Sequence, residues 1–324
     1  MIKVGIVGYG NLGRGVTLAV SQAKDMECVG IFTRRAPESV KPAINFPVYS
    51  IEKLIEFKGK VDVLLLCGGS ATDLPNNTAG ILKDFNTVDS FDTHAKIPEY
   101  FYKLDKVAKE NGTLGAISIG WDPGVFSIAR MLFGAVLPNG NDYTFWGKGV
   151  SQGHSDAIRR IAGVKNAIQY TIPKEQALSS VRNGENPNLK TRDKHLRECF
   201  VAVEDTADKA VIEKAIKEMP NYFADYDTIV NFVTEEEVKK MQQKLSHGGF
   251  VFRSGSTTEE NAHLLELSLK LDSNPEFTGS VLTAYGRAVA RLSKEGKTGC
   301  VTVFDIPLKY LSPESEEDLR AHLL

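Results

Sequence analysis

The stretch Lys3-Val4-Gly5-Ile6-Val7, followed by Gly8-Tyr9-Gly10-Asn11-Leu12-Gly13, decides the fold of this chain. An apolar strand pattern runs into a glycine-rich turn, and an apolar-periodic helical pattern begins immediately afterwards. In a G-x-G-x-x-G turn the three glycines allow a tight turn, close approach of a ligand and close packing of helix on strand. Because a helix start carries unpaired N–H groups and partial positive charge, the stretch predicts a pyrophosphate cradle at Gly8, Gly10, Asn11, Leu12 and Gly13. The alternative is an ordinary strand–helix turn that is rich in glycine.

The end of the next strand pattern indicates which dinucleotide binds. Residues 27–32 read as a strand that ends in Thr33-Arg34-Arg35, where an enzyme that uses NAD usually carries an acid. Two guanidinium groups and a hydroxyl suit a 2′-phosphate instead, which predicts NADP(H). We expect Thr33 and Arg34 to hold the phosphate and Arg35 to lie against the adenine. The alternative is that one arginine only solvates the strand end.

Composition narrows the class of protein. The 324 residues carry 39 Lys plus Arg and 41 Asp plus Glu, so no basic surplus indicates a nucleic-acid or membrane partner. No cleavable leader pattern and no apolar run of membrane-spanning length is present. The histidines lack metal-ligand spacing, so no metal is expected. The scattered cysteines, typical of a reduced, cytoplasmic protein, are Cys28, Cys67, Cys199 and Cys300.

The chain divides into regions of different pattern. Residues 1–122 alternate strands (2–7, 27–33, 61–67, 86–91, 114–119) with helices (12–24, 50–57, 74–84, 98–111), which predicts an α/β, Rossmann-type, doubly wound parallel sheet. Residues 123–275 predict a second, α+β domain with one open mixed or antiparallel sheet. Its expected strands are 142–148, 166–173, 197–204, 226–234 and 249–254, with helices at 207–219 and 259–271 and a polar loop at 182–194. Residues 276–324 add a helix at 277–295 and a strand at 299–305, and periodicity leaves open whether they return to the first domain.

Polar residues follow several strands of the first domain. Ligands bind beyond the carboxyl ends of strands in such sheets, so Cys67, Ser70, Ala71 and Thr72 are expected at the pyrophosphate or the nicotinamide ribose. Asp92 and Asp122 follow two further strands, and a converging pair of carboxylates could hold an ammonium group or accept a proton. For Asp122 the alternative is structural, because Asp-Pro-Gly is a turn signal and Asp is a good helix N-cap.

The second domain offers weaker candidates. Trp146 could wall a pocket beside the glycine-rich loop 147–156, or be a core residue. Arg197 could clamp a carboxylate, although the residues alone favour a surface arginine paired with Glu198. The residues alone likewise favour structural roles for Thr171, His247 and Asn274.

Taken together, these segments resemble the meso-diaminopimelate dehydrogenase family nearly end to end. The resemblance rests on residues 8–13, 34–35, 69–73, 120–124 (GWDPG), 145–147 (FWG), 151–156 (SQGHSD), 169–171 (QYT), 247–249 (HGG) and 270–275 (KLDSNP). The family implies reversible, NADP-dependent oxidative deamination of the D-centre of meso-2,6-diaminopimelate to L-2-amino-6-oxopimelate and ammonia, a step toward lysine and cell-wall precursors. It also implies a cytoplasmic homodimer whose second domain binds substrate and dimerises.

The resemblance also assigns roles to single residues. Asp92 and Asp122 match the positions that face the D-centre amino group and are the catalytic candidates, although which group takes the ammonium proton is left open. Trp146 matches the pocket wall, Gln152 and Gly153 a substrate-contacting loop, and Asn274 a further polar contact. Thr171, Arg197 and His247 match the group that holds the carboxylate of the L-centre. The remaining cofactor-side positions are Asp92, Thr93, His94, Trp121, Asp122, Pro123 and Gly124.

Two other functions remain as alternatives. One is another NADP-dependent oxidoreductase of similar layout, acting on a semialdehyde, homoserine or dihydrodipicolinate. A semialdehyde enzyme of the acyl-phosphate type needs a catalytic cysteine in the second domain, whereas Cys199 lies within an apolar strand pattern. The second alternative is a non-catalytic NADP-binding sensor, which would not need the polar segments around residues 120–156.

Overall fold

The computed structural model describes residues 1–324 and divides into two compact units, 1–128 with 275–324, and 129–274. None of the helices combines the length and the apolar composition that crossing a membrane requires.

The first unit is built on a parallel sheet of seven strands, which confirms the predicted Rossmann-type fold. The strand order is β14-β6-β5-β4-β1-β2-β3. The strands are β1 (Ile2–Val7), β2 (Met26–Thr33), β3 (Val48–Ser50), β4 (Val63–Leu66), β5 (Thr87–Asp89), β6 (Leu114–Ala116) and β14 (Gly299–Val301). The helices are α1 (Asn11–Gln22), α2 (Asp73–Leu82), α3 (Ile97–Asn111), the start of α4 (Val125–Val136), α10 (Asn274–Lys294) and α11 (Glu316–Leu323), with 3-10 turns η1 (Pro37–Ser39), η2 (Ile51–Phe57), η3 (His94–Lys96) and η4 (Leu308–Leu311).

The continuous apolar run of β4 explains why it lies in the middle of this sheet. Leu65 packs on one face with residues of α1 and α10, while Leu64 and Leu66 pack on the other face with residues of α2 and α3. All four residues of β4 are buried, as a strand covered by helices on both faces requires.

Helix α10 approaches α1 at backbone distance. A Cβ atom on Gly15 of α1 would lie 2.3 Å from the carbonyl oxygen of Pro275, and one on Gly279 would lie 2.5 Å from the backbone of Gly15. Both positions must therefore lack a side chain. This contact and the pairing of β14 with β6 attach the C-terminal segment to the first sheet.

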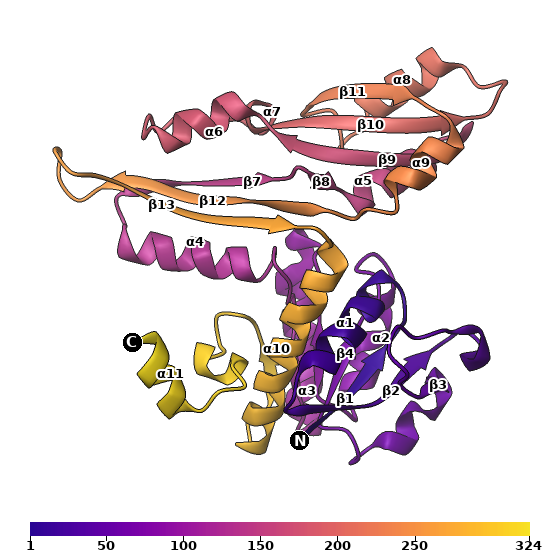
Figure 1. Cartoon of the computed structure of the whole chain (residues 1–324), viewed down its shortest axis with the longest axis vertical. Helices are drawn as coiled ribbons and strands as arrows, with labels where there is room; N and C mark the ends of the chain where they lie inside the picture. Colours follow the sequence, from indigo (N-terminus) through magenta and orange to yellow (C-terminus); the bar gives the residue numbers. More distant parts are fainter. The chain divides into compact units, whose positions relative to one another are not determined.

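The second unit contains two sheets, so the prediction of one open sheet was wrong. The four-stranded sheet has the order β11-β10-β9-β8, and the antiparallel three-stranded sheet has the order β13-β12-β7. In Figure 1, α4 and α6 lie on opposite sides of the three-stranded sheet. The elements are β7 (Gly140–Trp146), β8 (Gly149–Val150), α5 (Gln152–Arg159), β9 (Val164–Pro173), α6 (Glu175–Arg182), α7 (Thr191–Lys194), β10 (His195–Val203), α8 (Lys209–Lys217), β11 (Asp227–Phe232), α9 (Glu235–Met241), β12 (His247–Ser256) and β13 (Ala262–Leu271).

The predicted helix at 259–271 was also wrong, because this segment forms strand β13, the hairpin partner of β12. Leu265, Leu267 and Leu269 alternate with polar residues, which is the period of a strand with one covered face. The leucine-rich composition concealed that alternation. The predicted helix at 50–57 is the 3-10 turn η2, and the expected loop at 182–194 ends in the short helix α7.

We predict that Gly15→Ala lowers the free energy of unfolding, whereas the matched change Gly80→Ala does not. The added methyl group at Gly15 would overlap the backbone around Pro275, but nothing lies within 4 Å of the corresponding position at Gly80 in α2. Overpacking of this kind costs about 1–3 kcal/mol, and alanine is up to about 1 kcal/mol better than glycine in an open helix. Urea unfolding of both variants measures the difference. Equal stability of the two variants would contradict the close α1–α10 contact.

Candidate active site

The first unit presents the predicted cradle for a pyrophosphate. Gly8 turns the chain with φ +92°, and a Cβ atom on Gly13 would lie 2.2 Å from the Gly8 carbonyl oxygen. Gly10 caps α1 without a side-chain hydrogen bond, and space is open around it. The first intrahelical bond runs from Arg14 to Gly10, so the N–H groups of residues 11–13 precede it. Such N–H groups at a helix start suit an anion.

The end of β2 carries the residues that the sequence predicts to bind a 2′-phosphate. The Arg34 guanidinium is exposed and pairs with Asp73 at 2.8 Å, while Arg35 donates to the carbonyl oxygen of Tyr9 in the glycine turn. The Thr33 hydroxyl is buried and accepts the Arg35 N–H at 3.1 Å. A cavity of about 420 Å³ opens beside Gly8, Arg34 and Gly68, with an apolar lining that includes Phe32 and Ile51. A mainly apolar cavity that one arginine, Arg34, lines fits the adenosine end of a phosphorylated dinucleotide.

The loops that carry the two candidate aspartates lie at the carboxyl edge of the same sheet. The Asp92 N–H donates to Ser70 Oγ at 3.1 Å, which connects the β5–α3 loop to the β4–α2 loop. Asp122 lies between Trp121, which packs edge-to-face on Phe126, and Gly124, whose N–H donates to Ser127 Oγ at 3.1 Å. The loops after successive strands therefore lie at one edge of the sheet, as the topology requires.

In the second unit, Arg197 lies buried at the centre of a polar cluster, so its interpretation as a surface arginine was wrong. Arg197 and Thr171 are direct partners on the antiparallel strands β10 and β9, and the guanidinium donates to the Thr171 hydroxyl. Its carbon atom lies 3.9 Å from the centre of the Tyr226 ring. The side chain is only 5% exposed, Nε has no partner, and burial lowers the Arg197 pKa. No carboxylate forms an ion pair with this buried cation, so the cluster is suited to receive an anion.

His247 and Trp146 border the same cluster. A Cβ atom on Gly149 of β8 would lie 2.3 Å from His247 Cγ, so the histidine ring packs on this strand, where Gly149 pairs with Thr171. Gly147 donates to the Gly248 carbonyl at 2.8 Å, which brings the end of β7 beside the start of β12. The Asn274 N–H donates to Leu245 two residues before His247. Burial lowers the His247 pKa, and the Arg197 charge lowers it further.

Two further histidines belong to this cluster, and the sequence analysis did not assign them. His195 Nε2 accepts the Trp146 N–H at 2.8 Å, and the two rings stack at 5.4 Å. His154 Nδ1 lies 2.8 Å from Ser151 Oγ. Burial, followed by the Arg197 charge, lowers the pKa of His154 and of His195 to about 3. The cluster therefore holds neutral imidazoles around one buried guanidinium, that of Arg197.

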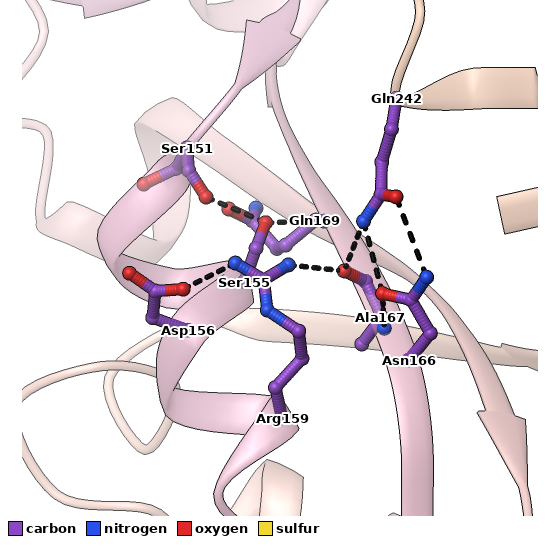
Figure 2. Close-up of polar contacts among 8 residues, drawn as sticks. All are labelled: Ser151, Ser155, Asp156, Arg159, Asn166, Ala167, Gln169 and Gln242. Carbon is purple, nitrogen blue, oxygen red and sulfur yellow. Dashed lines mark hydrogen bonds and ion pairs between the residues drawn. The ribbon is translucent and has the colours of Figure 1, made fainter. Parts of the chain in front are cut away.

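A polar network fastens α5, which begins with Gln152 and Gly153, to the same sheet (Figure 2). Ser155 Oγ donates to Ser151 O at 2.7 Å and accepts the Gln169 N–H at 3.0 Å. At the other end of the helix, Arg159 donates to the Ala167 carbonyl at 2.7 Å. The exposed Gln152 and Gly153 therefore lie on a helix turn that β9 holds in place.

The structure sorts the predicted site residues into two groups, one in each unit. Asp92 and Asp122 belong to the first unit, and within the second unit Trp146, Thr171, Arg197 and His247 converge. The sequence analysis did not assign His154, His195, Tyr226 and Gln169. The side-chain amide of Gln169 is buried and has no hydrogen-bond partner. His195 and Gln169 each lie two residues before a named candidate on its strand, so strand alternation was the signal that could have found them.

Comparison with known proteins identifies the family. The sequence model described as "Diaminopimelic acid dehydrogenase C-terminal domain" matches residues 120–273. A meso-diaminopimelate D-dehydrogenase from Ureibacillus thermosphaericus is 57% identical, and the alignment covers 100% of this chain and 99% of that protein. The chain belongs to the meso-diaminopimelate D-dehydrogenase family.

Solved structures of similar proteins agree with this family assignment. The C. glutamicum DAP dehydrogenase in complex with DAP superposes with a TM-score of 0.93 at 43% identity, covering 100% of this chain and 99% of that one. An engineered D-amino acid dehydrogenase bound to NADP+ superposes with a TM-score of 0.89 at 41% identity, covering 100% and 99%. The diaminopimelate dehydrogenase fold thus extends over the whole chain.

We predict that replacing Arg34 by Ala together with Arg35 by Asp weakens NADPH binding about a hundredfold, because each charge-assisted hydrogen bond to a phosphate contributes about 1.5–3 kcal/mol. NADH, which lacks the 2′-phosphate, should lose far less, namely the contact of Arg35 with the adenine. Fluorescence titration with both nucleotides measures the two affinities. Lys53→Ala, an exposed cation in η2, serves as the control. Equal losses for both nucleotides would contradict this account of the β2 end.

We predict that His195→Gln reduces the loss of stability on acidification. The folded-state pKa of about 3 lies below the ordinary 6.5, so nothing changes above pH 6.5, and between 6.5 and 3 only the unfolded state takes up the proton. At pH 5 this difference amounts to about 2 kcal/mol. Urea unfolding at pH 7 and pH 5 measures the slope, with exposed His322→Gln as the control. An unchanged slope for His195→Gln would show that His195 titrates normally.

Proposed function

We propose that this chain catalyses the reversible, NADP-dependent oxidative deamination of the D-centre of meso-2,6-diaminopimelate to L-2-amino-6-oxopimelate and ammonia, a reaction of lysine and cell-wall precursor synthesis. The observation that carries the proposal is the buried Arg197, which has no carboxylate partner in a chain 57% identical to a meso-diaminopimelate D-dehydrogenase. A substrate with a carboxylate far from its reacting carbon supplies the missing partner.

The residues of the first unit fit NADP. Residues 11–13 would hold the pyrophosphate with their N–H groups. Thr33 and Arg34 would hold the 2′-phosphate next to the cavity beside Arg34, and Arg35 would lie against the adenine. The bound cofactor supplies the acceptor for a hydride. The loops around Cys67, residues 70–72, 92–94 and 121–124 lie at the carboxyl edge of the sheet, where the nicotinamide end of such a cofactor binds.

The substrate has two ends that differ only in handedness, so each end needs its own anchor. Arg197, Thr171 and His247 would bind the carboxylate of the L-centre, with Trp146 as a wall, and Gln152, Gly153 and Asn274 as further contacts. Asp92 and Asp122 would hold the amino group of the D-centre by charge-assisted hydrogen bonds. A substrate bound in reverse would leave buried polar groups unpaired, which is a strong basis for discrimination.

The buried state of Cys199 weighs against a semialdehyde dehydrogenase of the acyl-phosphate type. Its side chain is fully buried, and burial raises the pKa of the thiol to about 12. A nucleophilic cysteine needs a lowered pKa and access to substrate. The neutral histidines and the buried cation also form a polar cluster for which a non-catalytic NADP sensor has no use.

The same proposal includes a cytoplasmic homodimer. All four cysteines are free, as is usual in a reducing compartment. Met131, Leu132 and Val136 of α4 are each about half exposed in the single chain, and β13 is an edge strand with Leu264 exposed. An apolar helix face beside an unpaired strand edge is a surface that a second copy of the chain would cover.

We predict that only meso-diaminopimelate, among the meso-, LL- and DD-isomers, supports rapid NADPH formation. The proposed binding mode requires an L-centre for Arg197 and a D-centre for the cofactor, and only the meso isomer has both. Absorbance at the NADPH band with each isomer and with NADP or NAD measures this selectivity. Comparable rates with the LL-isomer would contradict the assigned D-centre chemistry.

In the same assay Arg197→Met should raise KM for meso-diaminopimelate at least about tenfold, because it removes charge-assisted hydrogen bonds to the carboxylate. Its melting temperature should equal or exceed that of the wild type, since an unpaired buried charge is replaced by an apolar side chain. Arg192→Met, an exposed arginine of α7, is the matched control. A selective loss of NADP affinity in Arg197→Met would contradict the assignment of Arg197 to the carboxylate of the L-centre.

A further inference from the structure

Asp89 is a fully buried carboxylate at the carboxyl end of β5 that none of the assigned roles explains. Its Oδ1 atom accepts two backbone hydrogen bonds, from Phe91 N at 3.0 Å and from Ser118 N at 3.2 Å. Phe91 immediately precedes Asp92, and Ser118 begins the turn that leads to Asp122. A single oxygen atom therefore joins the two loops that carry the candidate aspartates.

The backbone around Ser118 shows how closely this second loop is held. Ser118 adopts φ +59°, in the left-handed region that a non-glycine residue occupies at a cost. The next N–H, that of Ile119, donates to the Asp89 carbonyl oxygen at 2.9 Å. Both the carboxylate and the carbonyl of Asp89 thus hold the turn in this conformation.

The surroundings of Asp89 fix the direction of its carboxylate. Oδ2 accepts the Tyr100 hydroxyl of α3 at 2.8 Å, and that hydroxyl lies 2.8 Å from Thr78 Oγ1 of α2. The Tyr100 ring stacks on Phe91 with centroids 4.2 Å apart. The groups that face Asp89 from α2, α3 and β14 are Thr78, Tyr100 and Cys300, and none is a cation. Hydrogen bonds, rather than an ion pair, stabilise the Asp89 carboxylate, although burial still raises the pKa of Asp89 to about 6.

We propose that Asp89 is a positioning residue for the reaction: by accepting one N–H from each loop, its carboxylate sets the spacing of Asp92 and Asp122 around the substrate amino group. This inference rests on the proposed function of that pair. Asp89 itself contacts neither substrate nor cofactor in this account. Small errors in the placement of reacting groups reduce turnover strongly, so the effect belongs in kcat.

The opposite end of β5 supplies a matched control. Asn86, just before the strand, accepts the Leu114 N–H at 2.9 Å and donates to the Asp62 carbonyl at 2.9 Å. Asn86 therefore connects the starts of β4 and β6. Asp89, at the other end of β5, connects the loops that follow β5 and β6. The amino edge of the sheet carries no candidate site residue, so loss of Asn86 should lower stability without altering the site.

The test compares Asp89→Ala, Asp89→Asn and Asn86→Ala in the full chain. We expect Asp89→Ala to lower kcat for meso-diaminopimelate, counted per NADPH-binding site, at least tenfold. Asp89→Asn should recover to within threefold of the wild type, because the amide oxygen still accepts both N–H bonds. Asn86→Ala should be less stable to urea yet keep the wild-type kcat per site. Asp89→Ser, whose hydroxyl is too short to join both N–H groups, replaces Asp89→Ala if that variant does not fold.

Hydrogen exchange provides a readout that is independent of turnover. Asp89→Ala should increase exchange in residues 90–93 and 118–122 together, and Asp89→Asn should not. Unchanged exchange in these segments, a kcat per site within twofold of the wild type, or an equal loss in Asn86→Ala would each overturn the inference. If the wild type does not oxidise meso-diaminopimelate at all, the proposed function fails, and the exchange result still decides whether Asp89 positions the two loops.

Discussion

The buried charge of Arg197 is the constraint on which the second unit depends. Taking a guanidinium out of water costs on the order of several kcal/mol unless a partner compensates it. The chain supplies the Thr171 hydroxyl and the Tyr226 ring but no carboxylate. The neighbouring histidines are kept neutral by the same burial and the same charge, so they do not add to the repulsion. The second unit thus keeps a buried cation that no carboxylate of the chain neutralises.

The first unit has a different requirement: it must bring many backbone N–H groups and the loops of two carboxylates to one edge of a sheet. Parallel strands do this without special chemistry, because their carboxyl ends all face one side. The precision comes from short polar bridges between successive loops. Ser70 connects the loop after β4 to Asp92, and Asp89 connects the loop after β5 to the turn before Asp122. The helix α10, returning from the far end of the sequence, packs on α1 so closely that only glycines fit.

Much of this fold could be predicted from the sequence because its signals are local. The glycine turn after β1 and the apolar run of β4 require no knowledge of distant residues. The burial of Arg197 could not be predicted in this way, because it depends on long-range strand pairing. Its neighbour in space is Thr171 on another strand, whereas its neighbour in sequence, Glu198, points to the other face. The helix predicted at 259–271 failed for a related reason: β13 is defined by pairing with β12, and the leucine content of the segment fits either period.

The residues that sequence analysis did not assign share one physical property. His154, His195 and Gln169 are polar groups whose roles come from burial beside Arg197, and burial cannot be read from spacing alone. The resemblance to a family supplied Thr171, Arg197 and His247, but it supplied no reason for the neutral histidines around them. The structure supplies that reason, because a protonated imidazole would stand beside a guanidinium in a site with little access to water.

A crystal structure of the chain with NADPH and meso-diaminopimelate bound tests the central claim most directly. We expect the carboxylate of the L-centre to accept hydrogen bonds from Arg197, and the amino group of the D-centre to lie at Asp92 and Asp122. A complex in which the Arg197 guanidinium contacts no carboxylate of the ligand, or in which the L-centre occupies the nicotinamide side, would contradict this claim.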